Sequence, residues 1–187
     1  YAVESSIAKV AGSEALNYVL DENIQIHGGN GYVRDYPAER HFRDARVNRI
    51  FEGTNEINRL LIPGMLIRRA LKGELPLIPA ARRLQDEVLA PSLPSLSDGD
   101  EPLDAELRAV AAFKKVALMV VGTAMQTYGD KLTDQQEVLS FAANILIEIY
   151  AAESAVIRAR QSRASGFASA DLHEAAARVY TDGAAAR

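Results

Sequence analysis

The sequence has 187 residues, of which 48% are hydrophobic and 25% are charged, and its formal net charge is −4. These values are typical of a globular protein with one domain or two small ones, and the absence of cysteine excludes disulfides, thiolate nucleophiles and zinc-thiolate sites from these residues. The negative net charge provides no general attraction to nucleic acid.

No signal peptide is visible, and the chain begins at Tyr1 directly in a helical pattern without a capping residue. We therefore expect it to have been cut out of a longer polypeptide. Its longest uncharged apolar stretches, such as VALMVVGTAM, are about half as long as a membrane-spanning helix requires. We expect no segment to cross a bilayer, and a location in the cytoplasm, or peripheral to the inner face of a membrane, fits these features.

The first predicted helix covers residues 3–26. Its apolar positions recur with the helical period, and they are Ile7, Val10, Ala11, Ala15, Val19 and Ile24. The pattern stops at Gly28, Gly29 and Gly31, which predict a helix end. Backbone N–H groups in such a turn can face a phosphate, although many glycine-rich helix ends bind none. No metal-ligand spacing links the three histidines, which are His27, His41 and His173.

A second, shorter helix is predicted from Pro37, a residue suited to the first helical position, through Arg46. Arginines are concentrated in and around it, and they are Arg34, Arg40, Arg43, Arg46, Arg49, Arg59, Arg68 and Arg69. Asp35, Glu39 and Asp44 alternate with them at helical spacing. We therefore expect ion pairs along a solvated or inter-subunit face.

The stretch IFEGTNEINRL, residues 50–60, opens a third predicted helix that runs from Thr54 to Gly73 with Pro63 inside it as a kink. Its acidic residue Glu52 has two interpretations. With Thr54 as the N-cap, Glu52 is one of the acidic residues that gather near helix starts. Alternatively, an apolar wall of residues 50–51 and the small Gly53 place the carboxylate in a pocket, where it could act as a general base.

The composition changes after this helix. The segment 74–102 contains five of the seven prolines and a Ser/Pro/Asp-rich stretch, which predicts a linker. Within it, AARRLQDEVLA (residues 80–90) contains an amphipathic patch around residues 80–89. The patch could lie on a membrane or pack against the protein, and packing is favoured because only Arg82 and Arg83 supply positive charge.

Three further helices are predicted downstream. The first carries an apolar stripe from Leu103 to Tyr128 and ends at Gly129. Thr133 and Gln136 form a capping-box pattern that opens the second, which Gly166 ends. The third extends through Tyr180 with Ser169 as its cap. With the amphipathic patch around residues 80–89 these helices make four amphipathic segments, which suffice for a small bundle.

No stretch alternates convincingly as a strand does, so the predicted fold class is all-α, a helical bundle followed by an additional helical domain. The predicted domains are residues 1–75, a linker at 76–101 that contains the amphipathic helix, and residues 102–187. We find no internal repeat.

The run QIHGGNGYVRDYPAERHFRDARVNRIFEGTNEINRL matches a known family in order, spacing and residue type. It resembles the C-terminal helical domain of the acyl-CoA dehydrogenases, over roughly residues 2–69. The resemblance implies a flavin enzyme that binds FAD and removes two hydrogens from the Cα–Cβ bond of an acyl-CoA, and it favours the functional interpretation of the carboxylate.

The resemblance implies a role for each matching residue. Glu52 corresponds to the base that takes the α-proton, while its backbone N–H helps to bind the developing enolate oxygen, and Gly53 corresponds to a substrate contact. Residues implied to touch FAD are Thr54, Asn55 and Glu56. Residues implied to meet the ADP portion of FAD across a subunit interface are Gln25, Ile26, His27, Gly28 and Gly29. The expected assembly is therefore a homodimer, and the expected electron acceptor is an electron-transfer flavoprotein.

The length beyond the EGT motif resembles the very-long-chain branch of the family, whose extra C-terminal helical domain is associated with membrane attachment. No residues here correspond to the family's N-terminal helical domain or its middle β-domain, which supply most flavin contacts. We therefore expect the isolated chain to bind FAD poorly and to be inactive toward acyl-CoA.

Alternative functions remain open. A related branch binds DNA, and the arginine cluster would carry that activity, but the interleaved acids, the negative net charge and the intact EGT motif argue against nucleic acid as a partner. Related oxidases pass electrons to oxygen, and isovaleryl-CoA enzymes place the base on another helix. The chain could also be a helical dimerisation or membrane-docking module in which Glu52 only precedes a helix.

Overall fold

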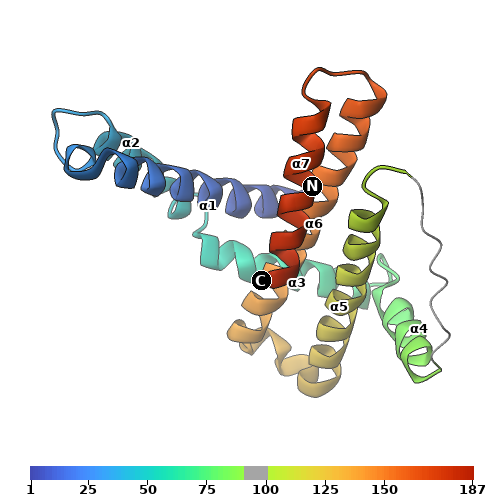
Figure 1. The fold of residues 1–187 in the computed structure, drawn as a ribbon. Coiled ribbons are helices and arrows are strands. Elements are labelled where there is room, and N and C mark those ends of the chain that lie inside the picture. Colours follow the sequence, from blue (N-terminus) through green and yellow to red (C-terminus); the bar gives the residue numbers. More distant parts are fainter. Residues whose placement is uncertain (91–100) are drawn as a thin grey trace. The chain divides into compact units, whose positions relative to one another are not determined.

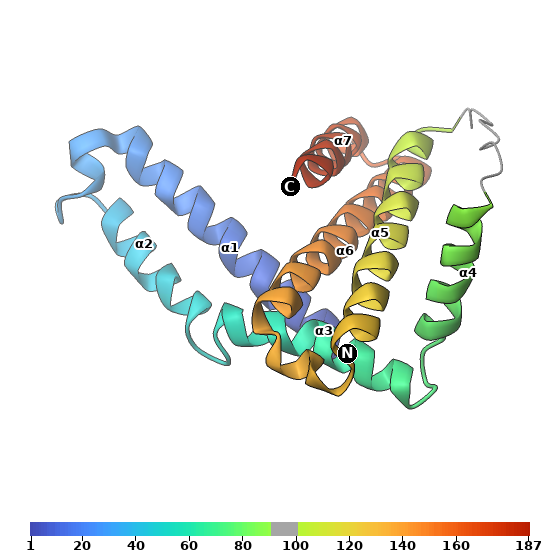
Figure 2. The same cartoon turned by 90° about the horizontal axis from the view of Figure 1, so that it is seen from below.

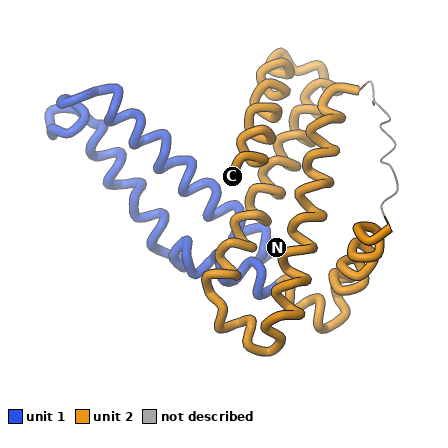
Figure 3. Tube along the Cα trace, turned by 60° about the horizontal axis from the view of Figure 1, so that its bottom comes forward, with its two compact units in different colours: residues 1–65 blue, residues 66–187 orange. Residues whose placement is uncertain are grey.

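The structure, a computed structural model, describes residues 1–90 and 101–187 (Figure 1). Within these ranges the regular elements are helices, with no strand, which confirms the predicted all-α class. The chain divides into two compact units, residues 1–65 and residues 66–187 (Figure 3). The three-part division predicted from the sequence stays a prediction, and the Ser/Pro/Asp-rich stretch at its centre lies mostly outside the described residues.

Unit 1 is built on a hairpin of two helices. α1 (Ala2–His27) ends at Gly28, which has a φ of 57°, a positive value that glycine adopts more readily than other residues. A 3₁₀ turn, η1 (Gly28–Gly31), follows. The chain then returns along α1 as α2 (Ala38–Arg46) and the short η2 (Val47–Arg49), as Figure 2 shows. The glycine stop and the helix start near Pro37 are both confirmed.

The third helix, α3 (Asn55–Leu71), begins in unit 1 and continues through Pro63. Ile62 and Pro63 are completely buried, so the proline ring packs as a core group inside the helix. The helix tolerates it without ending, although an internal proline removes one backbone hydrogen bond. The division between the units falls within this helix, after Met65.

Unit 2 contains the remaining helices, which are α4 (Leu77–Leu89), α5 (Asp104–Tyr128), η3 (Gly129–Asp134), α6 (Gln136–Ala164) and α7 (Ala170–Ala186). α6 packs against both α5 and α7, and a cluster of Leu103, Val156, Ala159 and Ala177 is buried there (Figure 2). α4 packs against α5, where Leu84 is buried and Ala81 lies close to Gly122. The amphipathic patch thus packs on the protein, as favoured from its charge.

Two details of the predicted helix starts are wrong. Thr133 lies in η3, and α6 begins at Gln136 with Gln135 as an N-cap that makes no side-chain hydrogen bond, so no capping box forms. Ser169 occupies the N-cap position of α7 but also makes no side-chain cap. α7 also extends past Tyr180 to Ala186, and the alanines of its last turn favour the helix. The buried Thr181 hydroxyl is satisfied within the helix, because it donates to the Ala177 carbonyl.

α6 is long and apolar enough to cross a membrane by length and composition, which differs from our expectation for the chain. This is weak evidence, because the core helix of a bundle satisfies the same test. Glu148 and Glu153 interrupt its sequence and pair with Arg187 and Lys114, respectively, within unit 2. Its packing against α5 and α7 buries part of its apolar surface, including Val156 and Ala159, whereas Phe141 and Ile157 stay exposed.

Candidate active site

The turn before α3 has a strained backbone. Glu52 has a φ of 53° and Gly53 a φ of 78°, so two consecutive residues adopt the left-handed conformation. Glycine does so freely, but for a residue with a Cβ the conformation costs on the order of 1–2 kcal/mol. A Cβ added at Gly53 would lie 3.1 Å from the Asn58 Nδ2 atom. The glycine is therefore needed, and the glutamate is held against its own preference.

Glu52 does not belong to the first turn of α3. The Thr54 hydroxyl oxygen accepts a hydrogen bond of 3.2 Å from the Ile57 N–H, which confirms Thr54 as the N-cap. The acidic residue of the first turn is Glu56. Its own backbone N–H, together with the Thr54 hydroxyl, holds the pKa of the Glu56 carboxyl below its usual value. The helix-start interpretation therefore fits Glu56, and Glu52 lies outside the helix.

Donors from α1 and α3 meet at the carbonyl of Gly53. The Lys9 ammonium donates to it over 2.7 Å, and Asn58 Nδ2 donates to it over 2.8 Å. The same Asn58 nitrogen also donates to the Thr54 carbonyl at 3.0 Å. The peptide after Gly53 is thus held from both sides, by one charged donor and one neutral donor.

Behind this turn lies a buried polar network centred on Asn55, which is 0% exposed. Its side-chain oxygen accepts from Lys9 at 2.7 Å, and its nitrogen donates to Ser13 at 2.9 Å. The nitrogen also donates to the Glu14 carboxylate at 3.1 Å. Because both the oxygen and the nitrogen of the Asn55 amide have hydrogen-bond partners, burying this side chain leaves neither atom unsatisfied.

The carboxylate of Glu14 is the charged end of this network. It binds the Arg59 guanidinium through two short hydrogen bonds, and Arg49 lies 3.8 Å away. Burial raises the pKa of the Glu14 carboxyl, but the hydrogen bond and charge of Arg59, with weaker help from its neighbours, hold that pKa below its usual value of 4.5.

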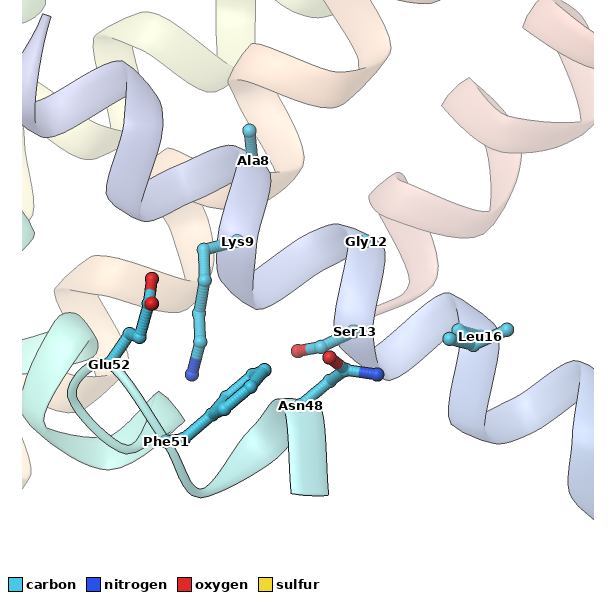
Figure 4. Close-up of a pocket in the computed structure, with 8 residues that line it drawn as sticks. All are labelled: Ala8, Lys9, Gly12, Ser13, Leu16, Asn48, Phe51 and Glu52. Carbon is cyan, nitrogen blue, oxygen red and sulfur yellow. The ribbon is translucent and has the colours of Figure 1, made fainter. Parts of the chain in front are cut away.

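A pocket of about 310 Å³ opens beside the turn (Figure 4). Its lining residues are Ala8, Lys9, Gly12, Ser13, Leu16, Asn48, Phe51 and Glu52. In Figure 4 the Lys9 side chain descends between Glu52 and Phe51. All of these residues belong to unit 1, so the pocket is formed within that unit.

The apolar wall expected from residues 50–51 is only partly present. Phe51 lines the pocket at 49% exposure, whereas Ile50 is 54% exposed and lies outside the lining. Ala8 and Leu16 of α1 supply the other apolar surface, because α1 passes across the turn. Glu52 is itself exposed, so this chain alone does not desolvate the carboxylate.

The glycine-rich segment lies away from the turn. Gln25 through Gly29 are exposed at the far end of the α1–α2 hairpin (Figure 2), and Ile26 is 83% exposed. Lys9 contacts the turn, and Gly28 lies 19 positions after Lys9 along α1. At 1.5 Å per residue, the distance between them along the helix axis is roughly 28 Å. The structure therefore does not bring the two predicted cofactor segments of one chain together.

The arginines of α2 pair as expected. Arg40 lies 3.6 Å from Asp44, and Arg43 lies 3.0 Å from Glu39, each at a spacing of four residues. These pairs account for part of the charge that a nucleic-acid site would need. Among residues 1–90 and 101–187, no group of three or more His, Asp and Glu side chains could hold a metal ion.

Residues that sequence reasoning missed are Lys9, Ser13, Glu14 and Asn58, while Arg59 was noted only for its charge. One signal was present. Lys9 and Ser13 are polar residues four positions apart, next to the apolar stripe of α1, and such a pair on a core-facing side indicates a buried polar contact.

Comparison with known proteins adds to this geometry. Two family models match the chain, at residues 2–66 and at residues 112–187, and each is described as "Acyl-CoA dehydrogenase, C-terminal domain". The matches confirm the resemblance drawn from the sequence. They also extend it to the downstream helices.

A "probable acyl-CoA dehydrogenase" of Bacillus subtilis is 48% identical over 167 residues, which are 88% of this chain and 27% of that protein. The human mitochondrial short-chain specific acyl-CoA dehydrogenase is 55% identical over 65 residues, or 35% of this chain and 16% of that protein. A crystal structure of an acyl-CoA dehydrogenase complexed with FAD, from Bacillus anthracis, matches with a TM-score of 0.90 and 45% identity. That match covers 98% of this chain and 31% of the other, so the chain spans under a third of these relatives.

Proposed function

This chain belongs to the acyl-CoA dehydrogenase family, whose C-terminal part it matches, and we propose that it forms that part of an FAD-dependent enzyme which introduces a double bond between Cα and Cβ of a fatty acyl-CoA. Glu52 is the proposed base. The observation that carries the proposal is the strained turn, which presents this carboxylate at the edge of a pocket.

The proposed chemistry follows from the acidity of the substrate. A thioester α-proton is a weak acid, so its removal needs a carboxylate close to the α-carbon and donors for the enolate oxygen. Glu52 would take the proton and become a neutral carboxylic acid. Within the described residues its backbone N–H has no acceptor, which leaves it available for the thioester oxygen. Bound acyl-CoA and protein outside this chain would exclude water from the exposed carboxylate.

The groups around the start of α3 fit one edge of a flavin. Thr54 and Glu56 carry polar side chains beside the turn, whereas the Asn55 amide is fully engaged within the protein and would support the site from behind. FAD, when bound, would supply the acceptor for the β-hydride. These few groups do not enclose a cofactor, in keeping with the expectation that the isolated chain binds FAD poorly.

A homodimer is part of the proposal. Residues 25–29 lie at one end of α1, whereas the start of α3 lies near Lys9 toward the other end. Both segments have exposed polar or backbone groups. We propose that residues 25–29 contact the ADP portion of the FAD held by the partner subunit. An electron-transfer flavoprotein as acceptor, the very-long-chain type and a cytoplasmic location all stay predictions.

The first test is the intact mass of the endogenous protein, with its flavin content. A mass well above 20.3 kDa with bound FAD supports the proposal. A flavin-free product near 20.3 kDa favours the dimerisation or docking module.

The second test replaces the base in the full-length protein. Glu52→Gln should lower kcat by about 10²–10⁴-fold while FAD stays bound. Glu153→Gln, which removes a carboxylate on α6 of unit 2 that is 101 positions away in sequence, is the matched control and should leave turnover unchanged. Full activity of Glu52→Gln would place the base elsewhere, and clear flavin-dependent turnover by the isolated 187-residue chain would refute its expected inactivity.

A further inference from the structure

The Gly53 carbonyl is the point at which α1 is bonded to the turn that carries Glu52. Lys9, in the second turn of α1, reaches it with a 2.7 Å hydrogen bond across 44 positions of sequence. Asn58, in the first turn of α3, reaches the same oxygen at 2.8 Å. Two donors from different helices therefore converge on one acceptor.

These bonds act on the backbone one residue after Glu52. The peptide that contains the Gly53 carbonyl follows two consecutive left-handed residues, and glutamate leaves that conformation readily unless its surroundings hold it. A change of φ at Glu52 to the ordinary negative range would reorient its Cα–Cβ bond and carry the carboxylate away from its present place in the pocket. Hydrogen bonds that hold the peptide between Gly53 and Thr54 oppose that change.

Lys9 is itself held in place. Its ammonium has three protons, of which one goes to the Gly53 carbonyl and a second to the Asn55 oxygen at 2.7 Å. Asn55 is completely buried and bonded further to Ser13. The aliphatic stem of Lys9 lines the pocket beside Glu52 (Figure 4). The ammonium is thus anchored on a rigid support and is not a mobile surface charge.

We propose that Lys9 is a positioning residue for the dehydrogenation reaction: by binding the Gly53 carbonyl it holds the left-handed turn, and so fixes the Glu52 carboxylate where it can remove the substrate α-proton. Asn58 is the second member of this clamp. The inference rests on the proposed function, because it assigns Lys9 a role only if Glu52 is the base.

The test uses the full-length, FAD-loaded protein and measures flavin reduction by acyl-CoA in a single turnover. Lys9→Met, which keeps an apolar stem and removes the donor, should lower the reduction rate constant by roughly 10²-fold. FAD content and the Kd for acyl-CoA should stay within about twofold of the wild type. Lys114→Met is the matched control, because Lys114 pairs with a glutamate on another helix far from the turn in sequence, and it should leave the rate unchanged.

Rescue separates positioning from general damage. Lys9→Cys alkylated with 2-bromoethylamine rebuilds a lysine analogue with sulfur in place of one methylene, and it should recover most of the lost rate. The wild type treated in the same way corrects for other cysteines. A purely structural loss would not return with the ammonium in the folded protein, so absence of rescue would count against the proposal.

A double-mutant cycle shows whether Lys9 acts through the base. Glu52→Asp withdraws the carboxylate by one methylene, and the losses caused by Glu52→Asp and Lys9→Met should be non-additive if both act on carboxylate placement. Additive losses would overturn the inference. If Lys9→Met does not retain FAD, Asn58→Asp, which removes the other donor to the same carbonyl, takes its place in the cycle.

The two proposals fail in distinguishable ways. An active Glu52→Gln protein refutes the proposed function, and the role of Lys9 falls with it. An inactive Glu52→Gln protein combined with a fully active Lys9→Met protein leaves the function standing and refutes only the positioning role.

Discussion

Arg59 and Glu14 form a two-point ion pair that joins α3 to α1. The guanidinium Nη1 lies 2.7 Å from Oε1 and Nη2 lies 2.8 Å from Oε2, so both carboxylate oxygens are engaged. The side chains are 19% and 32% exposed, respectively. Glu14 also accepts from Asn55, so this pair is the charged end of the network that reaches Lys9 and the candidate base.

Removing the guanidinium should destabilise the protein measurably. Arg59→Met leaves a partly buried carboxylate without its main counterion, and we expect the free energy of unfolding to fall by about 1–2 kcal/mol, between the values for exposed and buried pairs. Arg40→Met, which breaks an exposed pair with Asp44, is the control and should cost less than about 0.5 kcal/mol. Denaturant midpoints measure both. Equal small losses would show that the buried pair contributes no more than a surface pair.

The same pair predicts a pH dependence of stability. The pKa of Glu14 is lowered in the folded protein, so its carboxylate stabilises the fold at pH values above the unfolded value of about 4.5, and this contribution is lost as the pH falls through the lower folded pKa. The wild type should therefore exceed Glu14→Gln in stability at pH 7, and the difference should shrink toward pH 3. The difference at pH 7 should also shrink in the Arg59→Met background, because burial alone raises this pKa. A constant difference between pH 7 and pH 3 would contradict the prediction.

Features determined by neighbouring residues could be predicted from the sequence. The ends of α1 and α5 at Gly28 and Gly129 follow from glycines with φ near 55°, and the N-cap of α3 follows from one hydroxyl and its helix. The α2 ion pairs follow from a spacing of four residues. In each case the interacting groups are close in sequence, so a local sequence pattern is enough to predict the contact.

The conformation of Glu52 could not be predicted in this way. Nothing in the residues around it demands a positive φ, which is held by a lysine 43 positions earlier in the chain and by an asparagine on the following helix. The capping box at Thr133 fits the local pattern, but the chain there is a 3₁₀ turn that continues through Asp134, so the N-cap is Gln135 and α6 begins at Gln136.

Relieving the strain at Glu52 should stabilise the protein while removing the proposed base. Glu52→Gly permits the left-handed φ at no steric cost, whereas Glu52→Ala also lacks the carboxylate but keeps the Cβ. We expect the glycine variant to be more stable than the alanine variant by about 1 kcal/mol. This is opposite to the usual order of the two residues, so a more stable alanine variant would show that the turn relaxes easily. Denaturant midpoints of the two variants provide the comparison.

Gly53 and Gly64 provide an opposed pair of glycine substitutions within unit 1. Gly53 has a φ of 78°, and an added Cβ would lie 3.1 Å from the Asn58 nitrogen that binds its own carbonyl, so Gly53→Ala should both strain the backbone and displace one half of the clamp. A loss of about 1–3 kcal/mol is expected. Gly64 lies inside α3 with nothing within 4 Å of an added Cβ, and Gly64→Ala should gain about 0.5–1 kcal/mol from helix propensity.

The pair also separates stability from activity. Gly53→Ala should slow flavin reduction in the full-length protein more than its loss of stability explains, because it disturbs the peptide next to Glu52. Gly64→Ala should leave the reduction rate unchanged, since Gly64 lies nine residues after Asn55 along α3 and takes no part in the clamp. Assays well below the unfolding temperature keep both variants folded. A Gly53→Ala protein with wild-type reduction kinetics would mean that the turn tolerates distortion without moving the carboxylate, and that the hydrogen bonds at the Gly53 carbonyl serve stability alone.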